Sequence, residues 1–286
     1  MGESESIFTI TPMTQKLLLE PGEVREGTLL VVNPADAKAS FAYKVGVTPY
    51  NVVGNDYAAD LATKTERSRL VDWITIDEPL GAVAPNQSKE IHYTIRVPKD
   101  APAGGQYAAI TVGSDERDTS SAEGMTIKNV YEMASVLYAQ VSGEIIRSGE
   151  VLENDIPGFV TALPIVTRAK IKNDGNIHET AQVKVTVKNF LNGSQLYPNE
   201  TQEENTEEML MPETEREITR EVSDLSPVGL YEVTQTIEYL GKTSSSSSLV
   251  IACPIWFMAM IAVTLGVIIF GIMMLIRRHR KNKIVV

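Results

Sequence analysis

Short runs in which apolar and polar residues alternate fill most of the chain before residue 142. The alternation is clearest in Phe41–Val47 and Glu90–Val97, where every second side chain is apolar. Successive side chains of a strand point to opposite faces of its sheet, so this period predicts strands with one buried face. Further strands are expected at Ile7–Ile10, Gln15–Leu19, Gly27–Val32, Val71–Ile76, Tyr107–Val112 and Thr126–Val141. Turn residues separate the runs at intervals of about ten residues, which predicts a β-sandwich over residues 7–142, after an N-terminal tail of residues 1–6.

A second set of alternating runs predicts another sandwich over residues 158–241. Its expected strands are Val160–Ile165, Thr167–Lys172, Ala181–Phe190, Glu207–Met211, Glu215–Val222 and Leu230–Tyr239. Residues 143–157 are interrupted by Gly143, Gly149 and Pro157, so they are expected to form the junction. Residues 50–70 are polar and poorly periodic, which indicates an insertion in the first sandwich. The fold class predicted is all-β, with two tandem immunoglobulin-like β-sandwiches followed by a single transmembrane α-helix.

Three landmarks recur in the same order in both sandwiches. Asn33 and Asn173 each precede four alternating apolar residues by 8, 10, 12 and 14 positions. Pro85 and Pro212 each precede two apolar strand residues by 6 and 10 positions. A glycine before a tyrosine then opens a strand in each half, as Gly104 with Tyr107 and as Gly229 with Tyr231. The repeat predicts two copies of one sandwich topology.

These landmarks suit turns and corners rather than chemistry. Asparagine hydrogen-bonds locally in turns, and proline fixes φ before a strand, where no ladder donor is lost. Gly104 and Gly229 are expected to take positive φ. Tyr107 and Tyr231 are expected to bury their rings and return their hydroxyls to a turn backbone, as in a tyrosine corner.

The last uncharged stretch covers residues 249–276, which is 28 residues. About 20 helical residues cross the hydrocarbon core, so this stretch predicts one transmembrane helix. Residues 242–248 contain five consecutive serines and are expected to form a flexible stalk. Trp256 suits one membrane interface, and the tail of residues 277–286 begins with a basic cluster. That cluster, which includes Arg277, Arg278, Arg280 and Lys281, predicts a cytoplasmic C-terminus and an ectodomain outside.

The charge and the cysteine content limit the classes of binding partner and the cellular compartment that fit this chain. The whole chain carries a net charge of −11, and the five cations after residue 276 leave residues 1–248 at −16. An acidic ectodomain argues against nucleic acid. The single cysteine, Cys253, lies in the predicted span, so the ectodomain has no disulfide. This absence favours a bacterial surface protein over a secreted eukaryotic receptor, while a cytosolic location would be equally free of disulfides. Residues 1–6 do not resemble a signal peptide. We expect that a signal peptide directed the ectodomain outward and was removed from the mature chain.

Short motifs in both halves resemble bacterial surface proteins of the WxL-interacting type, whose tandem domains are often described as domains of unknown function. In the first half the motifs are PGE at Pro21–Glu23, LLVVNP at Leu29–Pro34, GNDY at Gly54–Tyr57, DWI at Asp72–Ile74 and the run Ile95–Val112. In the second half they are KNDGN at Lys172–Asn176, LMP at Leu210–Pro212 and PVGLY at Pro227–Tyr231. The resemblance implies a cell-surface protein whose first domain associates with peptidoglycan and whose second contacts partner surface proteins; it carries over no ligand-contacting residue.

No constellation of catalytic or metal-ligating residues stands out. The three histidines have no metal-ligand spacing, and no phosphate- or dinucleotide-binding motif occurs. Asp115, Glu116 and Asp118 leave open a weak Ca²⁺ site, with a solvated loop as the alternative. We therefore expect no enzyme, no cofactor and no small-molecule substrate.

The predicted function is that of a membrane-anchored surface protein that binds peptidoglycan or surface proteins. The insertion of residues 50–70 is its expected binding surface, and membrane lipid is expected around its span. The alternative is an accessory subunit of a transport or secretion complex, assembled through the span.

Overall fold

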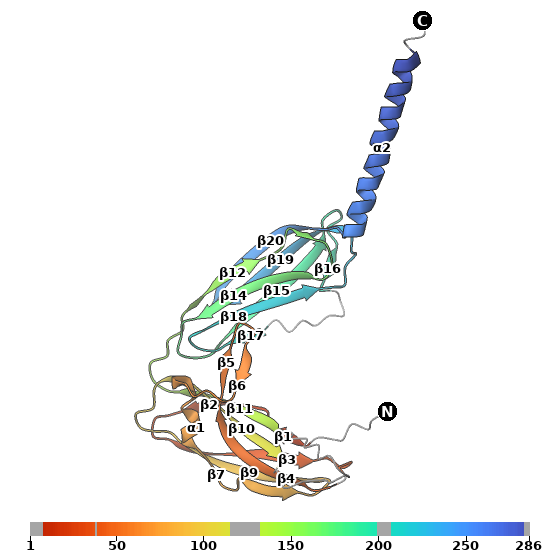
Figure 1. The fold of residues 1–286 in the computed structure, drawn as a ribbon. Helices are drawn as coiled ribbons and strands as arrows, with labels where there is room; N and C mark the ends of the chain where they lie inside the picture. Colours follow the sequence, from red (N-terminus) through yellow and green to blue (C-terminus); the bar gives the residue numbers. More distant parts are fainter. Residues whose placement is uncertain (1–7, 38, 115–131, 199–206, 283–286) are drawn as a thin grey trace. The chain divides into compact units, whose positions relative to one another are not determined.

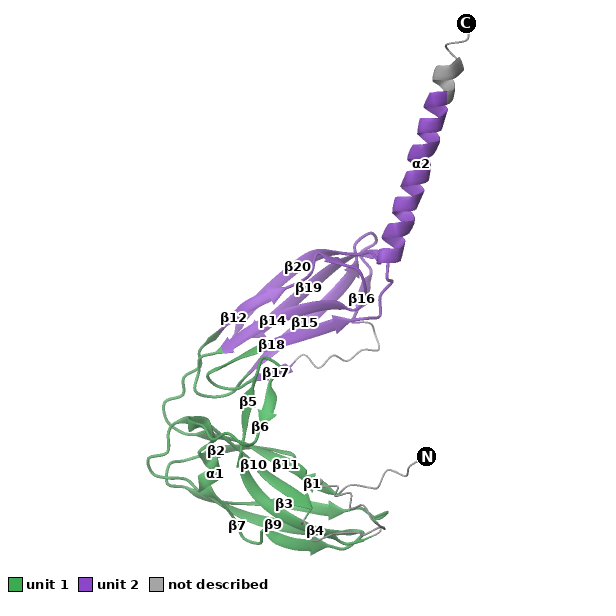
Figure 2. Ribbon diagram, in the orientation of Figure 1, with its two compact units in different colours: residues 1–149, 173–179, 210–216 green, residues 150–172, 180–209, 217–286 purple. Residues whose placement is uncertain are grey.

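The computed structural model describes residues 8–37, 39–114, 132–198 and 207–282, and the side chains of the last helix up to residue 277 (Figure 1). The chain divides into two compact units (Figure 2). Unit 1 comprises residues 1–149, 173–179 and 210–216, and unit 2 comprises residues 150–172, 180–209 and 217–286. Two short segments from the second half of the chain therefore belong to unit 1. The Asp115–Asp118 cluster and its loop lie outside the described residues.

Unit 1 is a sandwich of two sheets. One sheet has the order β1-β3-β9-β7 and the other the order β2-β11-β10-β4-β8. The buried cluster between them draws on both sheets, with Leu29 and Ile95 from one and Ile110 and Leu137 from the other. The strands are β1 (Thr9–Thr11), β2 (Thr14–Leu19), β3 (Val24–Asn33), β4 (Phe41–Pro49), β7 (Ile74–Ile76), β8 (Leu80–Val83), β9 (Gln87–Arg96), β10 (Gly104–Ser114) and β11 (Glu132–Val141).

Unit 2 contains the second sandwich. Its sheets have the orders β12-β14-β18 and β13-β20-β19-β15-β16, and β17 also pairs with β15. Val185, Val233 and Val250 of the larger sheet pack with Ile165 and Val222 of the smaller one. The strands are β12 (Gly149–Asp155), β13 (Phe159–Val160), β14 (Ile165–Asn173), β15 (Glu179–Asn189), β16 (Gln195–Tyr197), β17 (Glu207–Leu210), β18 (Thr214–Val222), β19 (Gly229–Tyr239) and β20 (Lys242–Ala252).

The two sandwiches share one strand order, as the internal repeat predicts. The run β1-β3-β9 corresponds to β12-β14-β18, and β2-β11-β10-β4 corresponds to β13-β20-β19-β15. The unusual parallel pair recurs as well, because β2 runs parallel to β11 and β13 runs parallel to β20. The predicted fold class, two tandem immunoglobulin-like sandwiches followed by a long apolar helix, is confirmed.

The predicted serine stalk at residues 242–248 is wrong. These residues form most of β20, which pairs with β19 from Tyr239↔Lys242 to Gly229↔Ala252. The stretch alternates between half-buried and exposed serines, and Val250 and Ala252 of the same strand are buried. Serine is small enough to tolerate the edge of a core, and its hydroxyl can pair across strands, as Ser247 does with Thr234 at 3.0 Å. Composition suggested a linker, but the long-range pairing decides the structure.

Two boundaries change as a consequence. The second sandwich begins at β12, inside the expected junction of residues 143–157, and ends at Ala252 rather than at residue 241. The helix α2 (Ile255–Asn282) begins six residues later than residue 249, because Leu249–Ala252 continue the strand. Within α2, Ile255–Arg277 is long and apolar enough to cross a membrane. Its most apolar 18 residues have a mean hydropathy of 2.7, and none of them is buried.

The insertion of residues 50–70 contains more structure than expected. It forms the hairpin β5 (Asn51–Val53) and β6 (Ala58–Asp60), then the 3₁₀ turn η1 (Glu66–Ser68). The helix α1 (Leu70–Trp73) follows and replaces the first half of the strand expected at Val71–Ile76. Leu70 and Trp73, three residues apart on one face of this turn, both enter the core of unit 1. Leu70 belongs to the insertion, so the insertion contributes a core side chain to unit 1 and is part of its fold.

Candidate functional site

A groove of about 700 Å³ opens beside η1 and α1 in unit 1. Ligand sites usually have volumes of about 300–1,000 Å³, so this groove is large enough for a ligand. One wall comes from the end of the insertion and α1: Lys64, Thr65, Glu66, Arg69, Asp72 and Trp73. The other wall is the β9–β10 loop: Pro98, Asp100, Ala101 and Pro102. The predicted binding surface and a loop about 30 residues further along therefore form one concave site.

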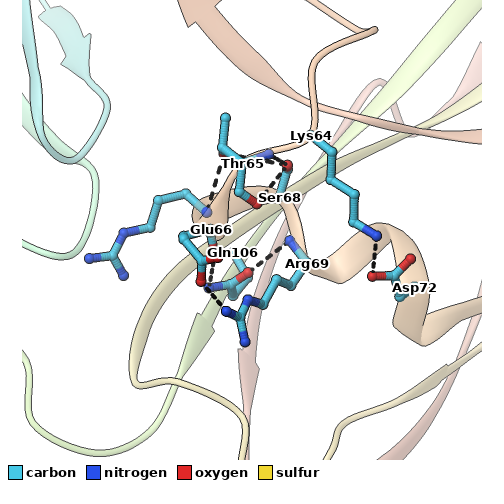
Figure 3. Close-up of polar contacts among 8 residues, drawn as sticks. Lys64, Thr65, Glu66, Ser68, Arg69, Asp72 and Gln106 are labelled. Atoms are coloured by element: carbon cyan, nitrogen blue, oxygen red, sulfur yellow. Dashed lines mark hydrogen bonds and ion pairs between the residues drawn. The ribbon is translucent and has the colours of Figure 1, made fainter.

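The buried side chain of Gln106 on β10 holds the turn in place (Figure 3). Its amide nitrogen donates to the carbonyl of Glu66, and its amide oxygen accepts from the backbone N–H of Arg69, both at 3.1 Å. A side-chain amide can satisfy one donor and one acceptor of a neighbouring backbone in this way. Gln106 thus ties the groove wall to a central strand of the sheet.

The start of η1 is closed by a reciprocal cap (Figure 3). The Thr65 hydroxyl accepts from the N–H of Arg67 at 3.2 Å, and the Ser68 hydroxyl accepts from the N–H of Thr65 at 2.7 Å. Such a capping box satisfies orphan donors at both ends of the first turn. The Thr65 hydroxyl also donates to the Asn51 side chain at 2.7 Å, which joins the turn to β5. This wall of the groove is preorganised, which reduces the ordering cost of binding.

Charges of both signs line the groove. Lys64 forms an ion pair with Asp72 at 2.5 Å, and Arg69 forms one with Glu66. Both pairs are exposed to solvent, so each contributes little to stability. Their side chains instead offer donors and acceptors to a ligand, beside the carboxylate of Asp100 on the opposite wall. The lining residues include no histidine and no cysteine, and the arrangement suits recognition of a polar ligand.

The other side of the insertion is anchored through the GNDY tyrosine. Tyr57 has a φ of 59°, and its hydroxyl accepts from the N–H of Met211 at 2.9 Å and pairs with the Thr214 hydroxyl. The guanidinium of Arg216 stacks over the Tyr57 ring at 4.7 Å, a cation–π geometry. Arg67 pairs with Glu213 at 2.5 Å. Segment 210–216 of unit 1 therefore braces the insertion, a role that its sequence did not reveal.

The repeated asparagines have matching partners. The side-chain amide of Asn33 donates to the carbonyls of Ala39 and Val83 at 3.0 and 2.9 Å. The amide of Asn173 donates to the carbonyls of Ile177 and Leu210 at 2.9 and 3.2 Å. Val83 and Leu210 each lie two residues before a landmark proline, so the two bridges are equivalent. Each asparagine ties its own turn to the segment that precedes the next strand.

The repeated prolines form equivalent turns. Asn86 after Pro85 has a φ of 59°, and Glu213 after Pro212 has a φ of 61°. The N–H of Gln87 donates to the carbonyl of Ala84 at 3.1 Å, which closes the first turn. Proline at the second position followed by positive φ is the pattern of a type II turn. Each turn leads directly into the third strand in the order of its sandwich's smaller sheet, β9 in unit 1 and β18 in the second sandwich.

The two glycines act differently from each other. Gly104 has a φ of 104°, and its position lies against Asn176, so a side chain there would be strained. Gly229 has no positive φ; it lies under the ring of Tyr231, and a Cβ at this position would collide with the phenol. Gly105 lies under Tyr107 in the same way, so Gly105 is the true counterpart of Gly229. The expectation of positive φ at Gly229 is therefore wrong.

The two tyrosines are both buried but bond differently. The Tyr231 hydroxyl donates to the carbonyl of Ser226 at 2.6 Å, five residues upstream. The Tyr107 hydroxyl instead accepts from the backbone N–H of His178 at 3.0 Å and lies 3.2 Å from its Nδ1. Burial is the main reason that the pKa of His178 is lowered, and the charges of Lys16 and Arg147 add to the effect. Tyr107 thus ties segment 173–179 to β10 within unit 1.

Of the expected membrane-anchor residues, Trp256 lies in the first turn of α2 and is exposed. Arg277 closes the apolar stretch Ile255–Arg277. The backbone of Arg278, Arg280 and Lys281 continues the helix, while their side chains lie outside the described part of the structure. The chain therefore has an apolar helix with a basic end.

No protein-family model matches the chain, and no curated protein does. Several solved structures are similar to the chain at low identity and low TM-score. The chaperone–tip adhesin complex of CFA/I fimbriae is 12% identical, with 87% of this chain and 100% of that chain covered and a TM-score of 0.42. The CsuC–CsuE complex of Acinetobacter baumannii is 13% identical, with 86% and 100% covered and a TM-score of 0.42. The Salmonella enterica SafA pilin with the SafB chaperone is 10% identical, with 88% and 98% covered and a TM-score of 0.42. At these identities and TM-scores the likeness indicates nothing about the role of this chain.

Proposed function

We propose that this chain is a membrane-anchored, non-catalytic binding protein that holds a cell-surface partner in the groove of unit 1. The observation that carries the proposal is the groove itself, a preorganised concave site between the insertion and the β9–β10 loop. The insertion lies between strands of a rigid sandwich, and binding commonly resides on segments added to such a scaffold.

The lining of the groove suits a polar polymer or a peptide. Threonine hydroxyl, carboxylate and cationic groups can pair with amides and sugar hydroxyls, while Pro98 and Pro102 give the groove a rigid apolar edge. The resemblance of the sequence motifs to WxL-interacting-type proteins leads us to expect peptidoglycan first and a partner surface protein second. The net charge of −11 makes nucleic acid an unsuitable partner.

The apolar helix supports the anchoring part of the proposal. Ile255–Arg277 is long enough to span a bilayer, and the basic residues after it favour a cytoplasmic C-terminus. Both sandwiches would then lie outside the cell, where cell-wall polymers and surface proteins are accessible.

The test is a binding measurement with the full chain in nanodiscs. Purified peptidoglycan is sedimented with the protein, and a surface extract is passed over immobilised protein in parallel. Asp100→Lys adds a cation to the groove and should weaken saturable binding by about tenfold or more if the groove is central to the interface. Glu26→Lys, an exposed charge reversal on β3 outside the groove, is the matched control and should bind as the wild type does.

Equal binding by Asp100→Lys and Glu26→Lys would place the interface elsewhere. A third chain, in which an unrelated apolar span replaces residues 255–277, separates the alternative function. A binding protein should retain its partner after this exchange, whereas loss of the partner would favour an accessory subunit assembled through the span.

A further inference from the structure

The larger sheet of unit 2 carries a row of large apolar side chains across one end of its outer face. Ile251 on β20 pairs with Phe159 on β13 and with Leu230 on β19. The N–H of Phe190, the residue after β15, donates to the carbonyl of Leu230 at 3.0 Å and extends the row. Directly paired residues point to the same face of a sheet, so these four side chains lie side by side.

Three of these four side chains are open to solvent, and Leu230 is half-buried. Phe159 is 49% exposed, Phe190 is 54% exposed and Ile251 is 40% exposed, and the neighbouring Leu191 is 80% exposed. Leu249, two residues before Ile251 on the same face, is also exposed. Single exposed apolar residues are normal, but an apolar row shared by adjacent strands marks an interaction surface.

The outer face turns polar within one row. Leu249 pairs with Glu232, which in turn pairs with Lys188. The next rows along the same face are hydroxyl-bearing or charged: Ser247, Thr234 and Thr186, then Ser245, Thr236 and Lys184, then Thr243, Glu238 and Gln182. The apolar character is therefore confined to one end of the sheet.

That end is the one from which α2 leaves. Ala252 is the last residue of β20, directly after Ile251, and α2 begins at Ile255, so two residues connect the strand to the helix. Trp256, in the first turn of α2, is the kind of aromatic residue that lies at a membrane interface. Where α2 enters a bilayer, the row cannot be far from the lipid headgroups.

We infer that the apolar end of this sheet, which we name the rim (Phe159, Phe190, Leu191, Leu230, Leu249 and Ile251), inserts into the interfacial layer of the membrane. The inference rests on the proposed anchoring by α2. Transfer of aromatic and aliphatic side chains from water to this layer lowers the free energy, and the polar rows beyond them remain in solvent. The membrane-proximal sandwich would then rest on the lipid surface, and the span would not be its only attachment.

The test measures contact between single labelled positions and lipid. The full chain with Cys253→Ser receives one cysteine, as Leu191→Cys in the rim, as Thr243→Cys at the polar end of the same face, or as Val267→Cys within α2. Leu191, Thr243 and Val267 are exposed, so the substitutions remove no core contact. Each labelled chain is reconstituted into phosphatidylcholine vesicles, with lipids that carry a spin label either near the headgroup or deep in the acyl chain.

A fluorophore at residue 191 should lose several-fold more emission to the shallow spin label than one at residue 243. Equal quenching at these two positions would overturn the inference. Shielded emission at residue 191 that does not respond to spin-labelled lipid would also overturn it, because protein would then cover the rim. The label at residue 267 tests the span separately: without quenching by the deep spin label, the proposed anchoring itself fails.

Discussion

Single polar side chains organise each sandwich by bonding to the backbone of another segment. Asn33, Asn173 and Gln106 are all buried, and each donates its amide to main-chain carbonyls. The offset of each asparagine from an alternating strand is visible in the sequence. The carbonyl that it meets, about 40–50 residues away, is not visible, because only the folded chain brings the two together.

Removal of the Tyr231 hydroxyl tests the corner bond in unit 2. Tyr231→Phe deletes the donor to the Ser226 carbonyl and keeps the ring that packs in the core. One net hydrogen bond contributes about 1 kcal/mol, so we expect unit 2 to lose about that much stability. Hydrogen exchange of the β19 and β20 amides measures the loss. Unchanged protection would show that the ring alone stabilises the corner.

Acid should destabilise unit 1 through His178. In the folded chain the pKa of His178 lies below its usual value of 6.5, mainly because the ring is buried. The unfolded chain therefore binds the proton more readily, so stability is full above the unfolded pKa and is lost as the pH falls through it. Protonation would also place a second donor at Nδ1, against a Tyr107 hydroxyl that already accepts the His178 N–H.

Urea unfolding between pH 7.5 and 5.5 checks this prediction. Trp73 reports on unit 1 when Trp256→Phe removes the second of the two tryptophans. His178→Asn should flatten the pH dependence in this range. An equal slope in the two chains would assign the acid sensitivity to other groups.

At the scale of elements, strands with regular alternation could be predicted, and elements decided by pairing or by a single turn could not. The strand β15 follows its apolar period closely, with Ala181, Val183, Val185 and Val187 all buried. The serine-rich half of β20 has no such period, and its position is set by the register with β19. The helix α1 could not be predicted either, because Val71–Ile76 is rich in β-branched residues and was expected to form a strand. Leu70 and Trp73 nevertheless share one helical face.

The end of the ectodomain is set by β20, which gives a direct test of the corrected boundary. A chain that stops at Ser248 loses the last four residues of β20, including the buried Val250 and Ala252. Burying one valine contributes about 1.5–3 kcal/mol, so this truncation should unfold or severely destabilise unit 2. A chain that stops at Pro254 keeps the whole strand and should resist proteolysis. Equal resistance of both fragments would mean that residues 249–252 contribute little to the sandwich.

At the scale of the whole molecule, the architecture could be predicted from the sequence, whereas the role of the insertion as a binding surface stays a prediction. The internal repeat predicted two sandwiches of one topology, and the polar insertion pointed toward the groove. The second wall of the groove, the 98–102 loop, lies far from the insertion in sequence and has no pattern that links the two. The brace by segment 210–216 was missed for the same reason, because its residues reside in a different half of the chain.

The groove can be tested most directly by photocrosslinking in cells that express the full chain. A photoreactive amino acid replaces Asp100 in the groove or, as the control, Glu26 on β3. We expect a discrete adduct, with cell-wall polymer or with one surface protein, from the groove position and not from position 26. Adducts that are absent at position 100, or equal at the two positions, would contradict the assignment of the groove as the binding site.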